Sequence, residues 1–175
     1  IGMPYHKWFD VTDGVRAQFV DAGHILGSAS VVIEAREGGE MKRLVFSGDI
    51  GRDGLAIIRD PEPPTGGADV ILCESTYGNR DHESVADARE HLARVVRETA
   101  ARGGRVLIPS FAVGRTQELV YDLHGLLREG RIPAIPIAID SPLAIDATAV
   151  FGMHPETYDH SEELVRRRTD LFDFP

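Results

Sequence analysis

Two stretches decide the fold of this chain: DAGHILGSAS at residues 21–30 and SGDIGR at residues 47–52. Each follows an apolar, strand-like run and carries one side chain of a metal-binding type, His24 or Asp49. Taken singly, His24 is more simply explained as a core or surface residue, and Asp49 as a turn or cap aspartate. Together, their glycine-containing turns let the backbone crowd around an ion, and imidazole with carboxylate suits zinc or manganese. The two stretches therefore predict a metal site.

The predicted secondary structure changes near residue 80, from strands to alternating helices and strands. Before it, apolar runs bounded by turn residues predict strands; these cover residues 15–20, 30–35, 44–47 and 70–73, with a hairpin loop at 37–40 and a long irregular connection at 53–67. After it, helices alternate with strands, as expected for a parallel sheet. The helices are expected from about residue 85 to residues 103–104, at 116–128 and at 142–151. A buried strand is expected at 105–109 and a further strand at 134–139.

Five segments occur in order along the chain: GHILGSAS, SGDIGR, CESTYGNR, PSFAVGRTQEL and DSPLA. They resemble the β-CASP branch of the metallo-β-lactamase superfamily, whose members are metal-dependent nucleic-acid hydrolases. The resemblance runs from about residue 15 to residue 159. It implies an α/β fold, with a partial metallo-β-lactamase αββα sandwich in residues 1–80. The start of a Rossmann-like parallel layer, the inserted β-CASP domain, follows in residues 81–175.

The resemblance also implies roles for three residues of the first part. His24 ligates one of two zinc ions, with manganese as the alternative metal, and Asp49 bridges both ions. Glu74, at the end of the run VILCE, corresponds to an acid that orients a later histidine, which protonates the leaving oxygen; a carboxylate can raise the basicity of an imidazole in this way. Asp49 and Glu74 are thus the expected catalytic residues. The alternative for Glu74 is a structural acid at a strand end.

The turn in PSFAVGRTQEL offers a second kind of site. Ser110 and Arg115 lie between a predicted strand and a helix, where free N–H groups and a guanidinium could grip an RNA phosphate. The alternative for Arg115 is a salt bridge with Glu118. In DSPLA, the more favoured interpretation of Ser141 is a helix N-cap.

The function that the resemblance implies is hydrolysis of single-stranded RNA by a two-metal ribonuclease, acting endonucleolytically. Two metal ions can hold a hydroxide and stabilise charge on the phosphoryl oxygens. Two alternatives remain: a lactamase-fold hydrolase of a small ester or thioester, and an inactive scaffold in an RNA-processing complex. A cytoplasmic protein is expected, without a membrane partner, and a homodimer is compatible with this interpretation.

One departure from the family pattern affects these expectations. The HxHxDH segment that supplies most metal ligands is missing from the sequence, as are the late histidine motifs. We therefore expect an internal fragment of a longer enzyme, which by itself binds metal weakly or not at all and does not cut RNA, because two ligands cannot complete two metal sites.

Composition limits the partners. The net charge of −9 weighs against a nucleic-acid partner, although two divalent ions would reverse the charge at the site itself. With 42% hydrophobic residues the chain can bury a core, and no apolar run approaches the roughly 20 residues that span a bilayer. The single cysteine, Cys73, excludes an internal disulfide and fits a reducing compartment. Its apolar strand setting predicts a buried thiol.

Overall fold

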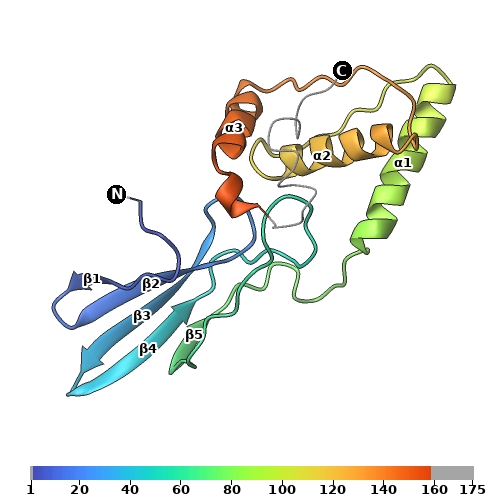
Figure 1. Cartoon of the computed structure of the whole chain (residues 1–175). Helices are drawn as coiled ribbons and strands as arrows, with labels where there is room; N and C mark the ends of the chain where they lie inside the picture. The colour runs from blue at the N-terminus through green and yellow to red at the C-terminus, as the bar shows by residue number, and fades with distance from the viewer. Residues whose placement is uncertain (1, 159–175) are drawn as a thin grey trace. The chain divides into compact units, whose positions relative to one another are not determined.

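The computed structural model describes residues 2–158 of the chain. These residues form two compact units, the first made of residues 2–53 and 58–80 and the second of residues 54–57 and 81–158. Each unit is described by itself below. Figure 1 labels the helices and strands. None of the helices within residues 2–158 combines the length and the hydrophobicity needed to cross a bilayer.

The first unit is built on a single five-stranded sheet in the order β1-β2-β3-β4-β5 (Figure 1). Its strands are β1 (Phe9–Thr12), β2 (Val15–Asp21), β3 (Ala29–Glu37), β4 (Glu40–Phe46) and β5 (Val70–Leu72). The first four strands pair antiparallel, and β5 pairs parallel with β4. The strands predicted at 15–20, 30–35, 44–47 and 70–73 are confirmed as β2 to β5. The prediction missed β1, a short and largely exposed strand.

Local pairing explains most of this sheet. Residues 37–40 form the predicted hairpin between β3 and β4, and Gly38 and Gly39 both have positive φ. Two such residues produce the turn whose twist matches paired strands. The core on one face consists of Val20, Val32 and Val45, with Trp8 packed against it. These three valines come from three neighbouring strands, so their burial fixes the register of the pairing.

The topology brings three strand ends to the same edge of the sheet. β3 runs opposite to β2 and β4, and β5 runs in the direction of β4, so β2, β4 and β5 all end where β3 begins. Their last residues are Asp21, Phe46 and Leu72. The turns that follow these strands carry His24, Asp49 and Glu74. The sheet therefore delivers the three candidate residues to one edge.

The second unit contains three helices, α1 (Val85–Ala101), α2 (Arg115–Arg128) and α3 (Pro142–Met153), and a short 3₁₀ helix, Pro155–Thr157. Ser84 caps α1 by accepting a hydrogen bond from Asp87 N–H. Ser141 caps α3 through Ala144 N–H, as predicted. A hydrophobic core joins α1, α2 and the segment after α2, and consists of Ala93, Val96, Leu123, Leu126 and Ile132.

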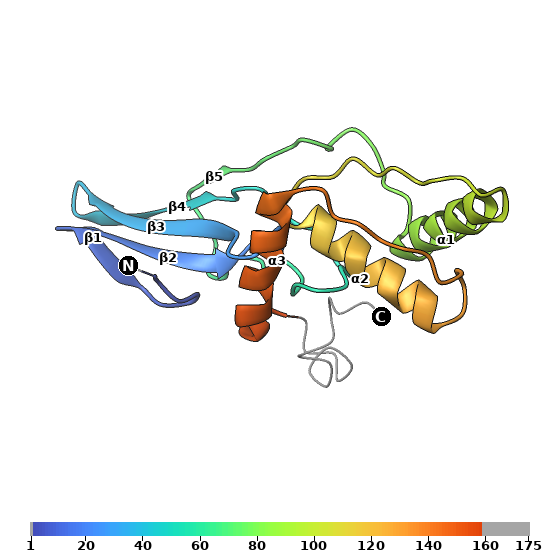
Figure 2. The same cartoon turned by 90° about the horizontal axis from the view of Figure 1, so that it is seen from above.

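The α/β class is confirmed, but both strands predicted after residue 100 are wrong. Residues 105–109 and 134–139 form no strand, and Figure 2 shows them within the long loops that join α1 to α2 and α2 to α3. Leu107 is 94% exposed. Ile135 and Ile137 do pack against the helical core. An apolar run alone does not make a strand, because the backbone also needs a hydrogen-bonded neighbour.

Cys73 is also placed differently from the prediction. The thiol is exposed instead of buried. It directly follows β5, the last strand of the sheet, where Val70, Ile71 and Leu72 are all exposed. The sequence pattern identified the strand correctly, but burial of its side chains requires a layer packed on the sheet, and the residues of this unit do not provide one there.

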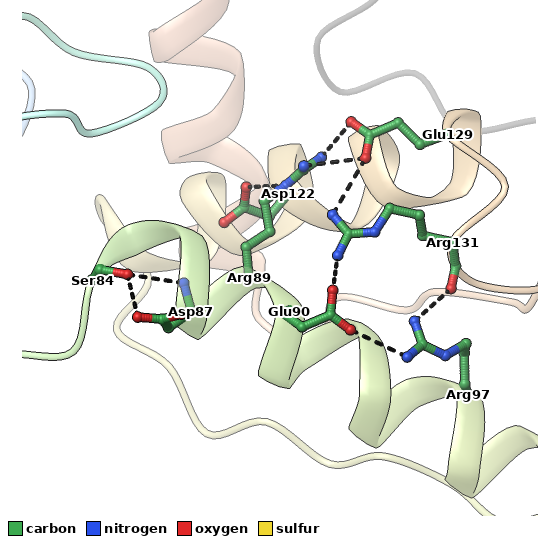
Figure 3. Close-up of polar contacts among 8 residues, drawn as sticks. All are labelled: Ser84, Asp87, Arg89, Glu90, Arg97, Asp122, Glu129 and Arg131. Carbon is green, nitrogen blue, oxygen red and sulfur yellow. Dashed lines mark hydrogen bonds and ion pairs between the residues drawn. The ribbon is translucent and has the colours of Figure 1, made fainter.

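A network of ion pairs links α1 to the end of α2 (Figure 3). The Arg89 guanidinium lies 2.8 Å from Glu129 and 3.4 Å from Asp122. Arg131 pairs with Glu129 and with Glu90, and Glu90 also accepts from Arg97. Three arginines thus meet three carboxylates, so the network carries no net charge.

Candidate functional site

His24 lies in the turn between β2 and β3, and Ser28 organises this turn. The Ser28 hydroxyl accepts hydrogen bonds from His24 N–H at 3.0 Å and from Ile25 N–H at 3.3 Å. Ser28 N–H in turn donates to the Ile25 carbonyl. The turn is closed by its own short-range bonds, and the His24 residue is left exposed. An exposed imidazole on a fixed backbone is suited to binding a ligand.

Asp49 lies in the turn that follows β4. This turn begins at the buried Ser47, whose N–H donates to the Leu72 carbonyl at 2.9 Å and whose carbonyl accepts from the Ser30 hydroxyl at 2.8 Å. Asp49 itself is exposed. Strands β3, β4 and β5 therefore fix the base of the turn, while the carboxylate two residues later faces solvent.

The two turns are in direct backbone contact. Gly51 N–H donates to the Ala22 carbonyl at 2.8 Å. A Cβ placed on Gly51 would lie 1.7 Å from the Gly23 oxygen and 2.8 Å from His24 N, so a side chain cannot fit at this position. Because Gly51 is two residues after Asp49, the contact sets one turn against the other. The structure thus brings the His24 and Asp49 turns together, as the sequence predicted.

Glu74 holds the Asp49 turn through hydrogen bonds. Its carboxylate accepts from Ile50 N–H at 2.8 Å and from Thr76 N–H at 3.2 Å, while its own N–H donates to the Ser47 hydroxyl. The Ile50 bond, followed by those from Thr76 and by the nearby His24 charge, lowers the pKa of Glu74 below its ordinary value of 4.5. Glu74 is therefore an ionised acid that stabilises the turn carrying Asp49. Its predicted bond to a later histidine stays a prediction.

Comparison with known proteins tests the family resemblance. A family profile for the Beta-Casp domain matches residues 116–175. A ribonuclease of Thermus thermophilus is 36% identical over 167 residues, which cover 94% of this chain and 36% of that protein. Transcription termination factor FttA of Methanosarcina mazei is 34% identical over 158 residues, covering 89% of this chain and 24% of the factor. Endoribonuclease YSH1 of Mycosarcoma maydis is 31% identical over 174 residues, covering 98% of this chain and 19% of the enzyme.

The chain is a β-CASP protein of the metallo-β-lactamase superfamily. The resemblance recognised in the sequence is thereby confirmed, and the α/β fold agrees with a partial β-CASP and lactamase architecture. The chain spans about a third or less of the length of these three relatives. Membership of a metallo-hydrolase family implies the use of metal.

The residues of this β-CASP chain fit part of such a metal site. His24 and Asp49 provide one imidazole and one carboxylate, a donor set that zinc accepts. Neither side chain makes a hydrogen bond to another residue within 2–158, so both remain available. Within the same residues there is no group of three or more His, Cys, Asp or Glu side chains placed to hold an ion. The donors present are of the right type, and others must complete the site.

The predicted substrate-binding residues belong to the second unit. Ser110 is exposed, and its hydroxyl is 3.4 Å from the Phe111 carbonyl. Arg115 is the first residue of α2 and pairs with Glu118 at 3.1 Å, the salt bridge named as its alternative. The Arg115 side chain is nevertheless 59% exposed. A contact with RNA therefore stays a prediction for both residues.

Sequence reasoning missed a residue that shapes this second turn. Gln117 is fully buried and accepts a hydrogen bond from Gly114 N–H at 2.8 Å. Its amide donates to the Ala112 carbonyl and to the Thr148 hydroxyl on α3. A glutamine at the third position of a helix is a known partner of the residue before the helix. That position was the available signal, and it identifies Gln117 as the residue that fixes the turn before Arg115.

Proposed function

We propose that this chain forms part of a two-metal ribonuclease that hydrolyses RNA phosphodiester bonds. The observation that carries the proposal is the convergence of His24, Asp49 and Glu74 at one edge of the sheet, with the His24 and Asp49 turns in backbone contact. The names of two relatives, a ribonuclease and an endoribonuclease, support this activity and favour endonucleolytic cleavage. The proposed substrate is single-stranded RNA.

In this proposal His24 and Asp49 hold the metal ions, which we take to be zinc, with manganese as the alternative. The ions, when bound, supply a hydroxide nucleophile and stabilise charge on the phosphoryl oxygens. The imidazole of His24 acts as a neutral donor and the Asp49 carboxylate as an anionic one. Glu74 keeps Ile50 N–H, and with it the Asp49 turn, in place. Positive metal charge at this edge would also offset the acidic net charge of the chain.

The second unit is proposed to guide the RNA. Arg115 is exposed at the start of α2, where a phosphate would meet both the guanidinium and the helix N-terminus. Ser110 is exposed in the same turn. We assign residues 1–80 to the lactamase-type part and residues 81–175 to the inserted β-CASP domain. The family profile over residues 116–175 supports the second assignment.

The test is to replace Asp49 by alanine in the full-length protein. Cleavage of a labelled single-stranded RNA should be abolished and bound zinc should fall, because an anionic metal ligand is lost. The matched control is Asp13→Ala, an exposed acid at the opposite edge of the sheet, which should leave both unchanged. Circular dichroism checks that both variants fold.

Three outcomes would count against the proposal. Wild-type RNA cleavage by the Asp49→Ala variant would exclude the mechanism. Faster cleavage of a small ester or thioester than of RNA would support a lactamase-fold hydrolase instead. An unmodified full-length protein that cuts neither substrate in zinc or manganese would support an inactive scaffold.

A further inference from the structure

Asp21 is a buried carboxylate placed three residues before His24. It ends β2 and is 6% exposed. Its Oδ1 accepts a hydrogen bond from Gly23 N–H at 3.0 Å, and its Oδ2 lies 3.4 Å from the Arg59 Nη2. A carboxylate this well buried is stable only when it is paired and hydrogen-bonded. Both oxygens of Asp21 meet that requirement, one of them within the turn that carries His24.

The partner segment around Arg59 packs tightly on the same turn. Glu62 N–H donates to the Asp21 carbonyl at 2.9 Å. A Cβ placed on Gly23 would lie 2.5 Å from the Pro61 nitrogen, and Gly23 has a φ of +59°. The irregular connection predicted at 53–67 thus contributes residues 59–62 to the support of the His24 turn. Asp21 is the side chain that joins the connection to the turn through charge.

The same turn is linked to Asp49. The Ala22 carbonyl, one residue after Asp21, accepts from Gly51 N–H at 2.8 Å. The Gly51 backbone also lies directly against the Gly23 carbonyl. A shift of the Asp21 turn must therefore move Gly51, and Gly51 is two residues from Asp49. Asp21 supports the His24 turn, which follows β2, whereas Glu74, which follows β5, supports the Asp49 turn.

We propose that Asp21, paired with Arg59, is a positioning residue that fixes His24 and, through Gly51, Asp49. The inference rests on the proposed role of His24 and Asp49 as metal ligands. A merely structural ion pair would stabilise the fold without affecting metal binding. A positioning residue must in addition change metal affinity, because supporting residues of a metal site typically account for about 10–100-fold in affinity or activity.

The test compares two carboxylates of the same sheet in the full-length protein. Asp21→Asn keeps the size of the side chain and one acceptor oxygen but loses the charge that faces Arg59. The matched control is Glu34→Gln on β3, because Glu34 also pairs with arginines, with Arg16 at 2.6 Å and Arg43 at 3.5 Å. Zinc affinity is measured by competition with a chromophoric chelator, and RNA cleavage is measured as separate kcat and KM values.

We expect Asp21→Asn to bind zinc about 10–100-fold more weakly, with a lower kcat and an unchanged KM. Arg59→Met should produce the same loss, and the double variant should be no worse than either single one, because all three break one pair. Glu34→Gln should retain wild-type zinc affinity. Equal zinc affinity in wild type, Asp21→Asn and Glu34→Gln would overturn the inference.

A second measurement needs no metal. In the metal-free protein, amide hydrogen exchange should become faster in Asp21→Asn at both residues 22–28 and residues 48–51, and in neither segment in Glu34→Gln. Faster exchange at 22–28 alone would overturn the link to Asp49. If His24→Ala and Asp49→Ala bind zinc as wild type does, the proposed ligands are wrong, whereas this exchange pattern still decides whether Asp21 positions the two turns.

Discussion

At the Asp49 turn of the first unit, a carboxylate accepts hydrogen bonds from backbone amides, whereas between α1 and the end of α2 in the second unit, charged side chains pair with one another (Figure 3). In the first unit, Glu74 binds the N–H of Ile50, one residue beyond Asp49. In the second, Arg89 binds Asp122 and Glu129. A side chain that holds a turn leaves its neighbours free to meet a ligand, while paired charges cancel. The first arrangement therefore builds a site, and the second stabilises a pair of helices.

The units also differ in how their apolar runs are used. In the first unit, hairpins let β1 to β4 pair with near neighbours in the sequence. In the second, residues 105–109 and 134–139 are separated by helix α2 and find no strand partner within residues 2–158. Parallel pairing across a helix is a long-range event that sequence pattern alone does not guarantee.

The largest expected effect tests whether the second unit is held by its helical core or by a buried strand. Leu126→Ala, at a fully buried position, should lower the free energy of unfolding of this chain by about 2–5 kcal/mol. Leu107→Ala should change it by less than about 0.5 kcal/mol, since Leu107 is 94% exposed. Urea unfolding measures both. Equal losses would show that residues 105–109 form the buried strand that the sequence predicted.

A smaller effect on stability is expected from alanine substitution of two glycines, one in crowded and one in open surroundings. Gly51→Ala should lower the free energy of unfolding by about 1–3 kcal/mol and lower the melting temperature, because the new methyl group meets the Gly23 carbonyl. Gly152→Ala on α3 meets nothing within 4 Å and should gain up to about 1 kcal/mol from helix propensity. Thermal unfolding compares them. If Gly51→Ala keeps the melting temperature of the wild type, the His24 and Asp49 turns are not in the backbone contact described above.

The smallest effect contrasts two carboxylates with opposite pKa shifts. Hydrogen bonds lower the pKa of Glu74, so its stabilisation is present above pH 4.5 and is lost as the pH falls through the folded pKa. Burial raises the pKa of Asp122 despite Arg89, so its contribution is present at low pH and is lost as the pH rises.

As the pH rises, the stabilities of the two corresponding variants relative to wild type should therefore change in opposite directions. Glu74→Gln should be less stable than wild type by about 1 kcal/mol or less at pH 7, with the difference shrinking below pH 4.5. Asp122→Asn should gain stability relative to wild type as the pH rises. Denaturant unfolding at pH 3.5 and pH 7 measures both differences. A parallel pH dependence of the two would contradict the assigned causes.

Much of the first unit could be predicted from sequence because the signals are local. Alternating or continuous apolar runs identified β2 to β5, and Gly38 and Gly39 identified the hairpin. β1 was missed because a short exposed strand leaves little hydrophobic signal. The burial of Cys73 was predicted wrongly because strand character does not reveal whether another layer covers the strand.

For the candidate sites, sequence identified the motif residues but not Asp21 and Gln117, two residues that support the turns. His24, Asp49 and Glu74 stand out through their motifs. Asp21 lies in the same motif, yet its role depends on Arg59, which is 38 positions away in an irregular connection. Gln117 likewise depends on a contact with α3. Such partners are set by tertiary packing, which single-sequence patterns do not encode.

The sequence by itself determined the family and the strand ends that carry the imidazole of His24 and the carboxylates of Asp49 and Glu74. It also determined the caps and turns between elements, because these depend on neighbouring residues. Only the tertiary structure decided that Gly51 contacts the His24 turn, that Arg59 meets Asp21, and that residues 105–109 stay exposed. The physical reason is the distance along the sequence over which each effect acts. Turns, caps and hydrophobic period arise within a few residues, whereas burial and charge pairing depend on segments that the folded backbone brings together.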